Sequence, residues 1–139
     1  MIEVSMVPPQ YIDTCWEKIE PFAEKAAKYT YGRYTTNNIY ERMLDENYQT
    51  WVAYDGPVFK GLVVTEIVTY PQRKLLSMHF CGGDNLKEWK SPMLALLQSF
   101  GKDMGCDGIE SVGRLGWGKV FENDGYKALW VTFELPIGE

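Results

Sequence analysis

The chain has 139 residues, of which 45% are hydrophobic and 14% aromatic, and its formal net charge is −5. This length suits one domain, because two halves would each be too small to bury a stable core. The apolar content excludes a disordered chain. Its Lys and Arg residues are scattered, which argues against nucleic-acid or membrane-surface binding and favours a basic substrate or partner.

The three cysteines, Cys15, Cys81 and Cys106, form no Cys-x-x-Cys pair, and His79 is the only histidine. These side chains are too few for a closed zinc site, so we expect no metal and free thiols in a reducing compartment. No run of eighteen apolar residues occurs, and residues 1–10 show no basic segment followed by an apolar one. We therefore expect a cytoplasmic protein that is neither secreted nor membrane-spanning.

The first part of the chain predicts a strand followed by two helices. Residues 2–6 alternate as a short strand, which two prolines end. Apolar residues over positions 12–26 recur at helical spacing, and Pro21 predicts a kink or break near its predecessor. A second, shorter helix begins at the capping side chains of residues 36–38.

The middle of the chain predicts three strands. Residues 50–55 and 58–70 form a hairpin, because β-branched residues dominate the second arm and Asp-Gly-Pro separates the two. Residues 74–81 form the next strand, which Gly82-Gly83 ends. Strict alternation sorts its side chains into two faces. One face carries Ser77, His79 and Cys81, and the other carries Met78 and Phe80.

The last part predicts a helix, a strand, a short helix and a final strand. The first helix opens with Ser91 as its cap and Pro92 as its first residue, and Gly105 ends it. A strand over residues 107–112, a helix over 117–123 and an alternating strand over 126–135 follow. The order β-α-α-β-β-β-α-β-α-β defines an α/β (α+β) domain with a mostly antiparallel sheet and one β-α-β crossover.

This order, with the segments TWVAYDG, LLSMHF, MLALLQSFGKDMGCDGIE and GRLGWGKVFENDGYK, resembles the GNAT superfamily of N-acetyltransferases across nearly the whole chain. The combination of TNNIYERMLDENYQTWVAYDG with a later GR-x-GW and a closing Gly-Tyr more narrowly resembles GNAT-like proteins of tailed bacteriophages. The resemblance implies one domain over residues 1–139 whose fourth and fifth strands splay apart. It also implies that acyl-CoA lies in the resulting notch, with its pyrophosphate at the N-terminus of the helix between these two strands.

Under this resemblance the acyl-CoA loop falls on residues 84–91, and its candidate contacts are Gly82, Gly83, Asn85, Lys87, Lys90 and Ser91. The loop departs from the family pattern, because bulky Leu86 and Trp89 and acidic Asp84 and Glu88 stand where spaced glycines are usual. A second departure is Phe121, which replaces the tyrosine that protonates the leaving thiolate in many family enzymes. Tyr126 is the candidate that takes over this role.

On the acceptor side, His79 is the first candidate for the general base, since histidine exchanges protons near neutral pH. Glu110 and Glu66 are the alternative bases, and a histidine satisfied by hydrogen bonds is the competing interpretation. Further candidates line the rim of the notch: Tyr31, Arg33, Tyr34, Arg114 and Trp117. Arg114 suits a phosphate or carboxylate, while Trp117 either stacks on a ligand or closes the core.

Two functions follow from these observations. The first is an acyl-CoA-dependent N-acyltransferase with a degenerate donor loop, acting on an amine acceptor. The second is a non-catalytic phage protein that uses the fold for virion assembly, DNA ejection or host-protein interaction, in the host cytoplasm or the virion. We expect a monomer or weak oligomer, because helical and strand faces account for the apolar residues.

Overall fold

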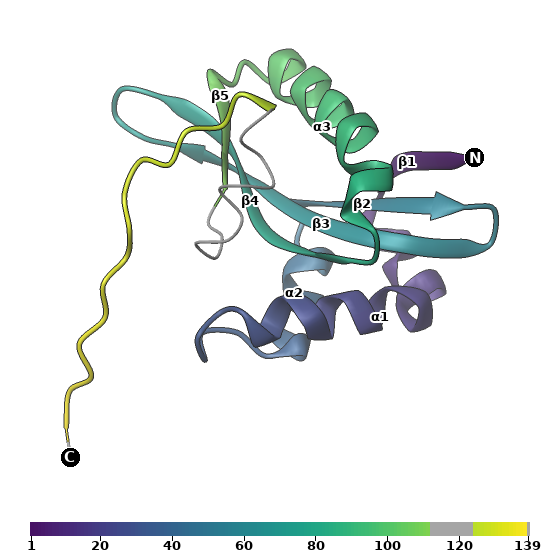
Figure 1. Cartoon of the computed structure of the whole chain (residues 1–139), viewed down its shortest axis with the longest axis horizontal. Helices are drawn as coiled ribbons and strands as arrows, with labels where there is room; N and C mark the ends of the chain where they lie inside the picture. Colours follow the sequence, from purple (N-terminus) through teal and green to yellow (C-terminus); the bar gives the residue numbers. More distant parts are fainter. Residues whose placement is uncertain (112–123, 139) are drawn as a thin grey trace.

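The computed structural model describes residues 1–111 and 124–138, and five strands form its central sheet in the order β1-β2-β3-β4-β5 (Figure 1). The strands are β1 (Ile2–Val7), β2 (Tyr48–Asp55), β3 (Val58–Thr69), β4 (Lys74–Gly83) and β5 (Gly108–Ser111). Neighbouring strands are antiparallel except β4 and β5, which are parallel. The predicted mixed, mostly antiparallel α/β fold is therefore confirmed.

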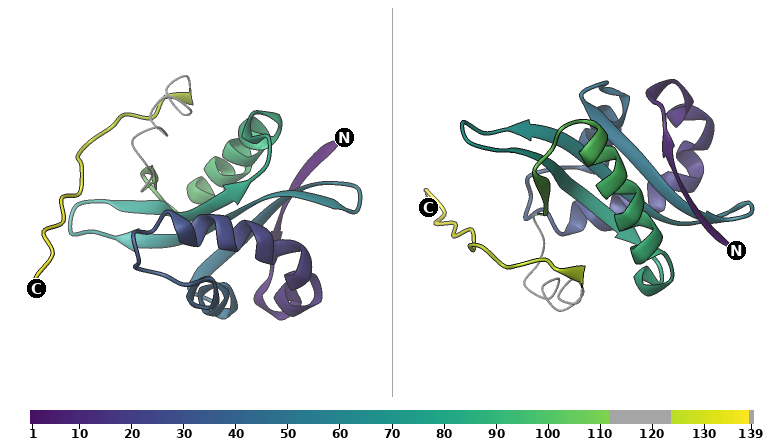
Figure 2. Two further views of the ribbon diagram at one scale, coloured as in Figure 1. Left: turned by 60° about the horizontal axis from the view of Figure 1, so that its bottom comes forward. Right: turned by 90° about the horizontal axis from the view of Figure 1, so that it is seen from above.

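Helices cover both faces of the sheet. They are α1 (Ile12–Lys28), α2 (Thr36–Leu44) and α3 (Leu86–Asp103), with a short 3-10 turn, η1 (Pro9–Tyr11), before α1. The pair α1 and α2 lies on one face and α3 on the other (Figure 2). One core cluster, with Phe22, Val64 and Phe80, fills the α1/α2 side, and a second, with Trp51 and Trp89, fills the α3 side.

Helix α1 continues through Pro21, so the predicted break is wrong. Pro21 is exposed, whereas Phe22 and Ala23 beside it are buried. The amide hydrogen bond that proline cannot make is thus lost on the solvent side, where water replaces it. The buried apolar face keeps the helix continuous, as its spacing predicted.

The N-cap of helix α2 lies one residue before the predicted capping residues. Thr35 is the N-cap: its side chain accepts a hydrogen bond from the Asn38 amide, and the Asn38 side chain accepts one from the Thr35 amide. This reciprocal pair is a capping box in which Asn38 takes the place of the usual Glu or Gln.

Strand β4 contains a register shift that strict alternation could not predict. Thr65 pairs with Met78 and Val64 pairs with Phe80, so His79 is the extra residue of a bulge. Met78 consequently packs in the α3-side cluster and Phe80 in the α1/α2-side cluster. The prediction that these two residues share a face is wrong, because the bulge reverses the alternation after it.

The glycine pair Gly82-Gly83 forms the last two residues of β4, which ends at Gly83. A Cβ on Gly82 would lie 2.2 Å from the carbonyl oxygen of Phe22. Glycine at this position therefore lets the backbone of α1 pack directly on the sheet. The strand ends at the predicted glycine pair, and Gly82 in addition allows the close approach of a helix.

Helix α3 starts at Leu86, so the predicted start at Ser91 and Pro92 is also wrong. Asn85 occupies the N-cap position with φ of 49°. The first amides of the helix therefore belong to residues of the predicted loop, 84–91. Pro92 lies inside the helix and is exposed, as Pro21 is in α1. The predicted end is confirmed, because Gly105 follows the helix with φ of 75°.

Residues 126–138 form no strand, which contradicts the predicted final strand over 126–135. They run as an extended segment past β5 and away from the sheet (Figure 1). The predicted helix over 117–123 lies outside the described residues. No helix in the described ranges is long and apolar enough to cross a membrane.

Candidate functional site

The two parallel strands, β4 and β5, are paired over a short stretch. β4 and β5 pair from Leu75 with Gly108 to Met78 with Ser111, where the described part of β5 ends. From His79 to Gly83, β4 pairs with β3 on one side and with no described strand on the other. His79 is therefore the first residue of β4 beyond its described pairing with β5.

His79 makes a short contact with a carboxylate on the neighbouring strand. Its Nε2 lies 2.7 Å from Oε1 of Glu66, and both side chains keep about a quarter of their surface exposed (27% and 29%). Glu66 pairs with Ser77, and alternation places His79 on the same face of β4 as Ser77. A histidine held by a carboxylate and open to solvent is suited to accept and release protons.

A row of polar side chains crosses the sheet beside this pair. Tyr48, Glu66, Ser77 and Glu110 occupy paired positions on β2, β3, β4 and β5 and so share the α1/α2 face. Two carboxylates thus flank β4, one on each side of the buried Ser77. This row brings two carboxylates to one face of the sheet, where they would attract a cationic group.

Tyrosines accompany both carboxylates. The Tyr70 hydroxyl donates to Glu110 Oε2 at 2.9 Å, and this hydrogen bond raises the pKa of Tyr70. Partial burial, followed by the nearby Glu66 charge, raises the pKa of Tyr48. The Arg42 guanidinium lies 5.7 Å from the centre of the Tyr48 ring. Glu110 is thus held by Tyr70, and Glu66 by His79, before any ligand arrives.

Tyr126 approaches the other face of β4. Its hydroxyl donates to Sδ of Met78 at 3.3 Å, next to the last pair of β4 with β5. Burial raises the pKa of Tyr126 to about 12, with smaller contributions from Asp124 and Cys81. The hydroxyl therefore stays protonated at neutral pH and can only donate a proton.

The predicted donor loop is largely helical. Lys87 and Ser91 are exposed residues of α3, and Ser91 caps nothing. Lys90 Nζ lies 2.8 Å from Asp124 Oδ2, so this lysine is already paired with a carboxylate. Asp84, which would repel a phosphate, is paired with Lys25 of α1 at 2.6 Å.

Trp89 fills the space above the glycines that end β4. A Cβ on Gly83 would lie 2.7 Å from the Trp89 ring, and one on Gly61 across the pair would lie 2.3 Å from it. The Trp89 indole N–H donates to the Asp84 carbonyl at 3.0 Å. The glycines therefore accommodate an indole ring of this chain.

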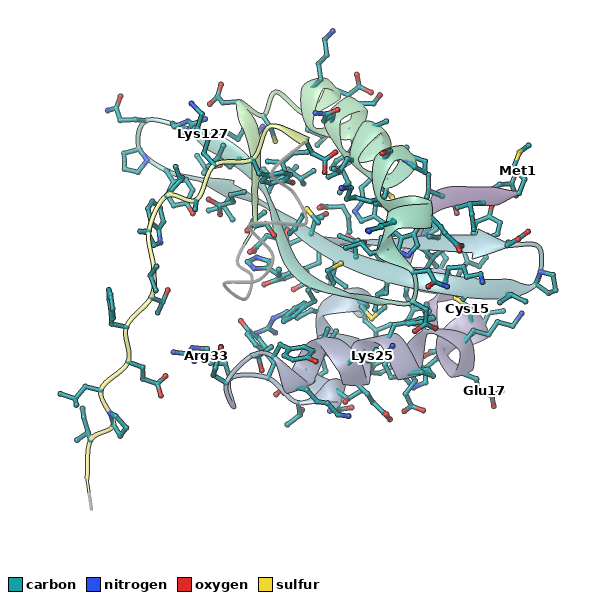
Figure 3. All side chains as sticks on the ribbon, viewed as in Figure 1. Met1, Cys15, Glu17, Lys25, Arg33 and Lys127 are labelled. Carbon is teal, nitrogen blue, oxygen red and sulfur yellow. The ribbon has the colours of Figure 1, made fainter. Side chains whose placement is uncertain are left out.

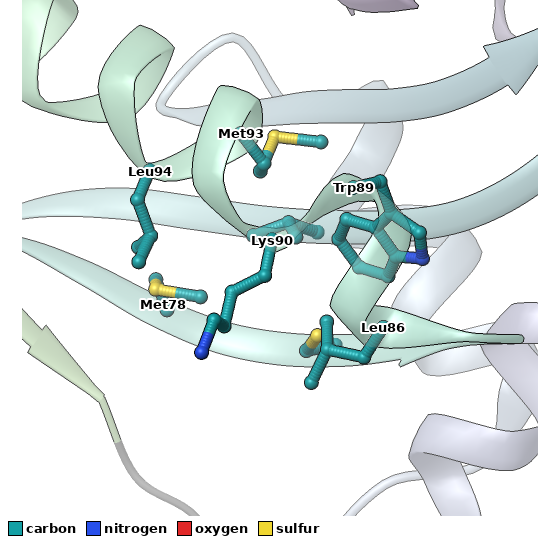
Figure 4. A pocket seen from close by; sticks show the side chains of 8 residues that line it. Met78, Leu86, Trp89, Lys90, Met93 and Leu94 are labelled. Atoms are coloured by element: carbon teal, nitrogen blue, oxygen red, sulfur yellow. The ribbon is translucent and has the colours of Figure 1, made fainter. Parts of the chain in front are cut away.

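A small hollow lies beside that indole, between α3 and the sheet (Figure 4). It has about 10 Å³ of room, which is the volume that one water molecule needs. Its lining consists of Val63, Met78, Cys81, Leu86, Trp89, Lys90, Met93 and Leu94. The Cys81 thiol is enclosed here, and burial raises its pKa to about 12.

The predicted rim residues are only partly gathered at the site. Tyr34 packs edge-on against Phe80, with ring centres 4.8 Å apart, so it belongs to the core boundary. Tyr31 is 78% exposed, and Arg33 pairs with Glu134 at 2.6 Å. Arg114, Trp117 and Phe121 lie outside the described residues.

Sequence reasoning missed three contributors, namely Lys25, Tyr48 and Tyr70. Each joins the site through a contact between distant parts of the chain, such as the separation of 40 residues between Tyr70 and Glu110. No local motif signals such contacts. In the described ranges, no group of three or more His, Cys, Asp or Glu residues is placed to hold a metal ion.

No protein-family model and no curated protein sequence matches the chain. Solved structures do resemble it. Ribosomal-protein-alanine N-acetyltransferase from Brucella melitensis biovar Abortus 2308 superposes with a TM-score of 0.73 at 11% identity, over 99% of this chain and 100% of that chain. Aminoglycoside N-acetyltransferase AAC(6')-Iy, solved in complex with CoA, gives 0.74 at 12% identity, over 99% and 95%.

A third similar structure is an aminoglycoside acetyltransferase from an uncultured soil metagenomic sample, with a TM-score of 0.72 at 10% identity over 99% of both chains. At these identities the likeness concerns the fold. The chain therefore has the GNAT fold, as the order of its elements indicated.

Proposed function

We propose that the protein is an acyl-CoA-dependent N-acyltransferase that transfers an acyl group to a cationic amine. The observation that carries this proposal is the His79–Glu66 contact of 2.7 Å at the opening of β4 and β5. The GNAT fold supports it, since one similar structure was solved with CoA. The fold by itself does not define an activity, so the site must carry the argument.

In this reaction His79 removes a proton from the ammonium group of the acceptor, directly or through one water molecule. The free amine nitrogen attacks the thioester carbonyl carbon, forming a C–N bond. The nitrogen then gives up its second proton to solvent, and collapse of the tetrahedral intermediate breaks the C–S bond and releases CoA thiolate. Glu66 orients the His79 ring and stabilises the imidazolium that forms, so it is a positioning residue.

The thiolate needs a proton when it leaves. Tyr126 keeps its proton at neutral pH, and its hydroxyl contacts Met78 of β4, the last residue of that strand that pairs with the described part of β5. It is therefore the general acid in this proposal, replacing the tyrosine that the family pattern places at Phe121. The alternative base, Glu110, is hydrogen-bonded by Tyr70 and is assigned instead to attracting the amine.

For the donor, the proposal places the pyrophosphate at the start of α3, near Asn85 and Lys87. Free amides of a first helical turn and an exposed lysine favour an anion. The acceptor approaches from the opposite, acidic side, where Glu66 and Glu110 flank β4. This division of charge keeps the two substrates in separate parts of the notch.

Acetyl-CoA binding and turnover test this function. Millimolar acetyl-CoA should raise the melting temperature, and lysine-ethyl-ester or a polyamine should then release free CoA. His79→Gln should abolish release while the acetyl-CoA shift persists. Glu3→Gln, which removes an exposed carboxylate from β1, is the matched control and should change neither. Absence of both a melting shift and calorimetric heat with acetyl-CoA would refute the proposal.

A second function is favoured by one observation, the Trp89 ring that occupies the space above Gly61 and Gly83. A filled donor side suits a non-catalytic protein, encoded by a phage, that uses the fold for virion assembly, DNA ejection or host-protein binding. The same experiment separates the two. The Trp89→Ala variant lacks the ring that obstructs this space. If neither the unaltered protein nor this variant binds acetyl-CoA, the result favours the non-catalytic role.

A further inference from the structure

Arg42 of α2 holds its guanidinium against two tyrosine rings. Its Cζ lies 5.9 Å from the centre of the Tyr34 ring and 5.7 Å from the centre of the Tyr48 ring. Tyr34 precedes α2, and Tyr48 is the first residue of β2. Aromatic faces attract a cation and restrict the rotation of a long side chain. The two rings therefore fix the position of the guanidinium before any ligand binds.

The charge of Arg42 has no partner in the described part of the chain. The residue is half-buried, and its Nε is buried without a hydrogen-bond partner. The ion pairs among the described residues do not include Arg42. Asp45, at the end of the same helix, accepts a hydrogen bond from the Asn47 amide instead. Partial burial of an unpaired cation costs free energy, and a bound anion would offset that cost.

A second arginine of this region, Arg33, is in a different situation. It lies in the turn between α1 and α2 and extends toward the C-terminal segment, residues 126–138 (Figure 3). There its Nη2 lies 2.6 Å from Oε1 of Glu134. Arg33 thus has a carboxylate partner within the chain, whereas Arg42 has none among the described residues.

Tyr48 connects Arg42 to the proposed base. The centre of the Tyr48 ring lies 5.8 Å from that of His79 and 5.7 Å from Arg42 Cζ. Burial and the Glu66 charge raise the pKa of Tyr48, and the Arg42 charge opposes them. One aromatic ring therefore borders both a fixed cation and the His79–Glu66 pair. The Glu66 end of this arrangement favours an ammonium group, and the Arg42 end favours an anion.

We propose that Arg42 binds a carboxylate of the acceptor whose amine reacts, so that the preferred acceptor is an ω-amino acid or an amino acid with a side-chain amine. A guanidinium presents parallel N–H donors that a carboxylate accepts in pairs. A short flexible chain between the two groups lets the amine reach His79 while the carboxylate stays on Arg42. This inference rests on the proposed function, which assigns the amine to His79 and Glu66.

Binding measurements test Arg42 without any catalytic step. The probes are ε-aminocaproate and γ-aminobutyrate, and each is compared with its amide, which keeps the amine and the length but lacks the negative charge. NMR titrations of the full chain, with and without CoA, give the affinities. At least one acid should bind about tenfold more tightly than its amide, as expected for one paired charge. Equal affinity of both acids and their amides would overturn the proposal.

Two variants show whether Arg42 produces this preference. Arg42→Gln removes the charge and should abolish the preference for the acid. Arg42→Lys keeps the charge without the planar fork and should retain a smaller preference. Arg73→Gln, an exposed residue of the turn between β3 and β4, is the matched control and should keep the full preference. Melting temperatures establish that each variant is folded. A preference that survives Arg42→Gln, or is absent from a folded Arg42→Lys variant, would contradict the assignment.

Steady-state rates with acetyl-CoA separate this inference from the proposed function. The KM of the preferred acid should be about tenfold below that of its amide, with similar kcat values, because the carboxylate contact is the same in ground state and transition state. Arg42→Gln should raise the KM of the acid to that of the amide and leave the amide unchanged, whereas a purely structural role would affect both.

The two failures are distinguishable. Turnover of acid and amide with equal KM would overturn the carboxylate site and leave the acyltransferase intact. Absence of turnover with every amine would refute the acyltransferase, and the NMR titrations would then decide the carboxylate site by themselves.

Discussion

The indole of Trp89 lies so close to the backbone of Gly61 that a Cβ on Gly61 would stand 2.3 Å from the ring carbon Cζ2. This contact joins α3 to β3 and leaves Trp89 only 1% exposed. It also fills the space between the start of α3 and the facing glycines of β3 and β4.

Replacing Gly61 by Ala should therefore destabilise the fold by about 1–3 kcal/mol, because the ring must move from a packed position. In a Trp89→Leu background the same change should cost much less, which a double-mutant cycle by chemical denaturation would measure. Gly101→Ala, in α3, is the control. A Cβ on Gly101 would lie 3.7 Å from Cβ of Cys106, which is an ordinary van der Waals distance. Equal costs of Gly61→Ala in both backgrounds would disprove the steric explanation.

His79 and Glu66 should differ in their effects on turnover. Loss of the base in His79→Gln should lower kcat by about 10²–10⁴-fold. Glu66→Gln keeps a hydrogen-bond acceptor but removes the charge, so its effect should be smaller and should disappear in the His79→Gln background. Rates of CoA release in the four variants measure this coupling. Additive effects would show that Glu66 does not act through His79.

Thr65 links two side chains inside the α3-side core. Its hydroxyl accepts from the Trp51 indole N–H at 2.9 Å and donates to Gln49 Oε1 at 2.8 Å, and it is fully buried. Thr65→Val should cost about 1–3 kcal/mol, because the indole N–H is left buried without an acceptor. Thr65→Ser keeps the hydroxyl and should cost clearly less. Denaturation midpoints that rank the two variants in reverse would contradict this account.

Alkaline pH should destabilise the protein through Cys81 and Tyr126. Burial raises the pKa of Cys81 from 9.0 to about 12 and that of Tyr126 from 10.0 to about 12. Both groups hold their protons more tightly in the folded chain. Their contribution to stability is therefore full below pH 9 and is lost as the pH rises towards 12.

Melting temperatures measured from neutral to alkaline pH would show this decline. Cys81→Ala should remove the part that begins near pH 9, and Tyr126→Phe the part that begins near pH 10. Each variant also alters packing, which shifts the melting temperature at every pH. The comparison therefore uses the slope of melting temperature against pH. Identical slopes in all three proteins would show that other groups govern the alkaline transition.

Local patterns predicted most of the elements before the structure was known. The spacing of apolar residues located α1, α2 and the three strands that follow, and Gly105 marked the end of α3. These features depend on residues a few positions apart, which is the range over which helix and strand periods act. The α/β class followed from their order alone.

The site was predicted less well, because its geometry depends on pairings between strands. The bulge at His79 and the row that joins Tyr48, Glu66, Ser77 and Glu110 arise from cross-strand register. A shift of one residue exchanges the two faces of a strand, so alternation could not assign them after the bulge. The sequence named His79 and Glu66 separately as candidate bases, but no local pattern indicated that the two side chains contact each other.

The sequence by itself determined the elements, the class of fold and the set of residues able to exchange protons, because these follow from residue type and short-range period. Only the tertiary structure decided where α3 begins, since Trp89 is buried over two glycines that lie far from it along the chain. It likewise decided that residues 126–138, despite their strand-like alternation, lie outside the sheet. Alternation of apolar residues predicts that a strand has an apolar face. Which other element covers that face depends on where the edge of the sheet lies in the folded chain.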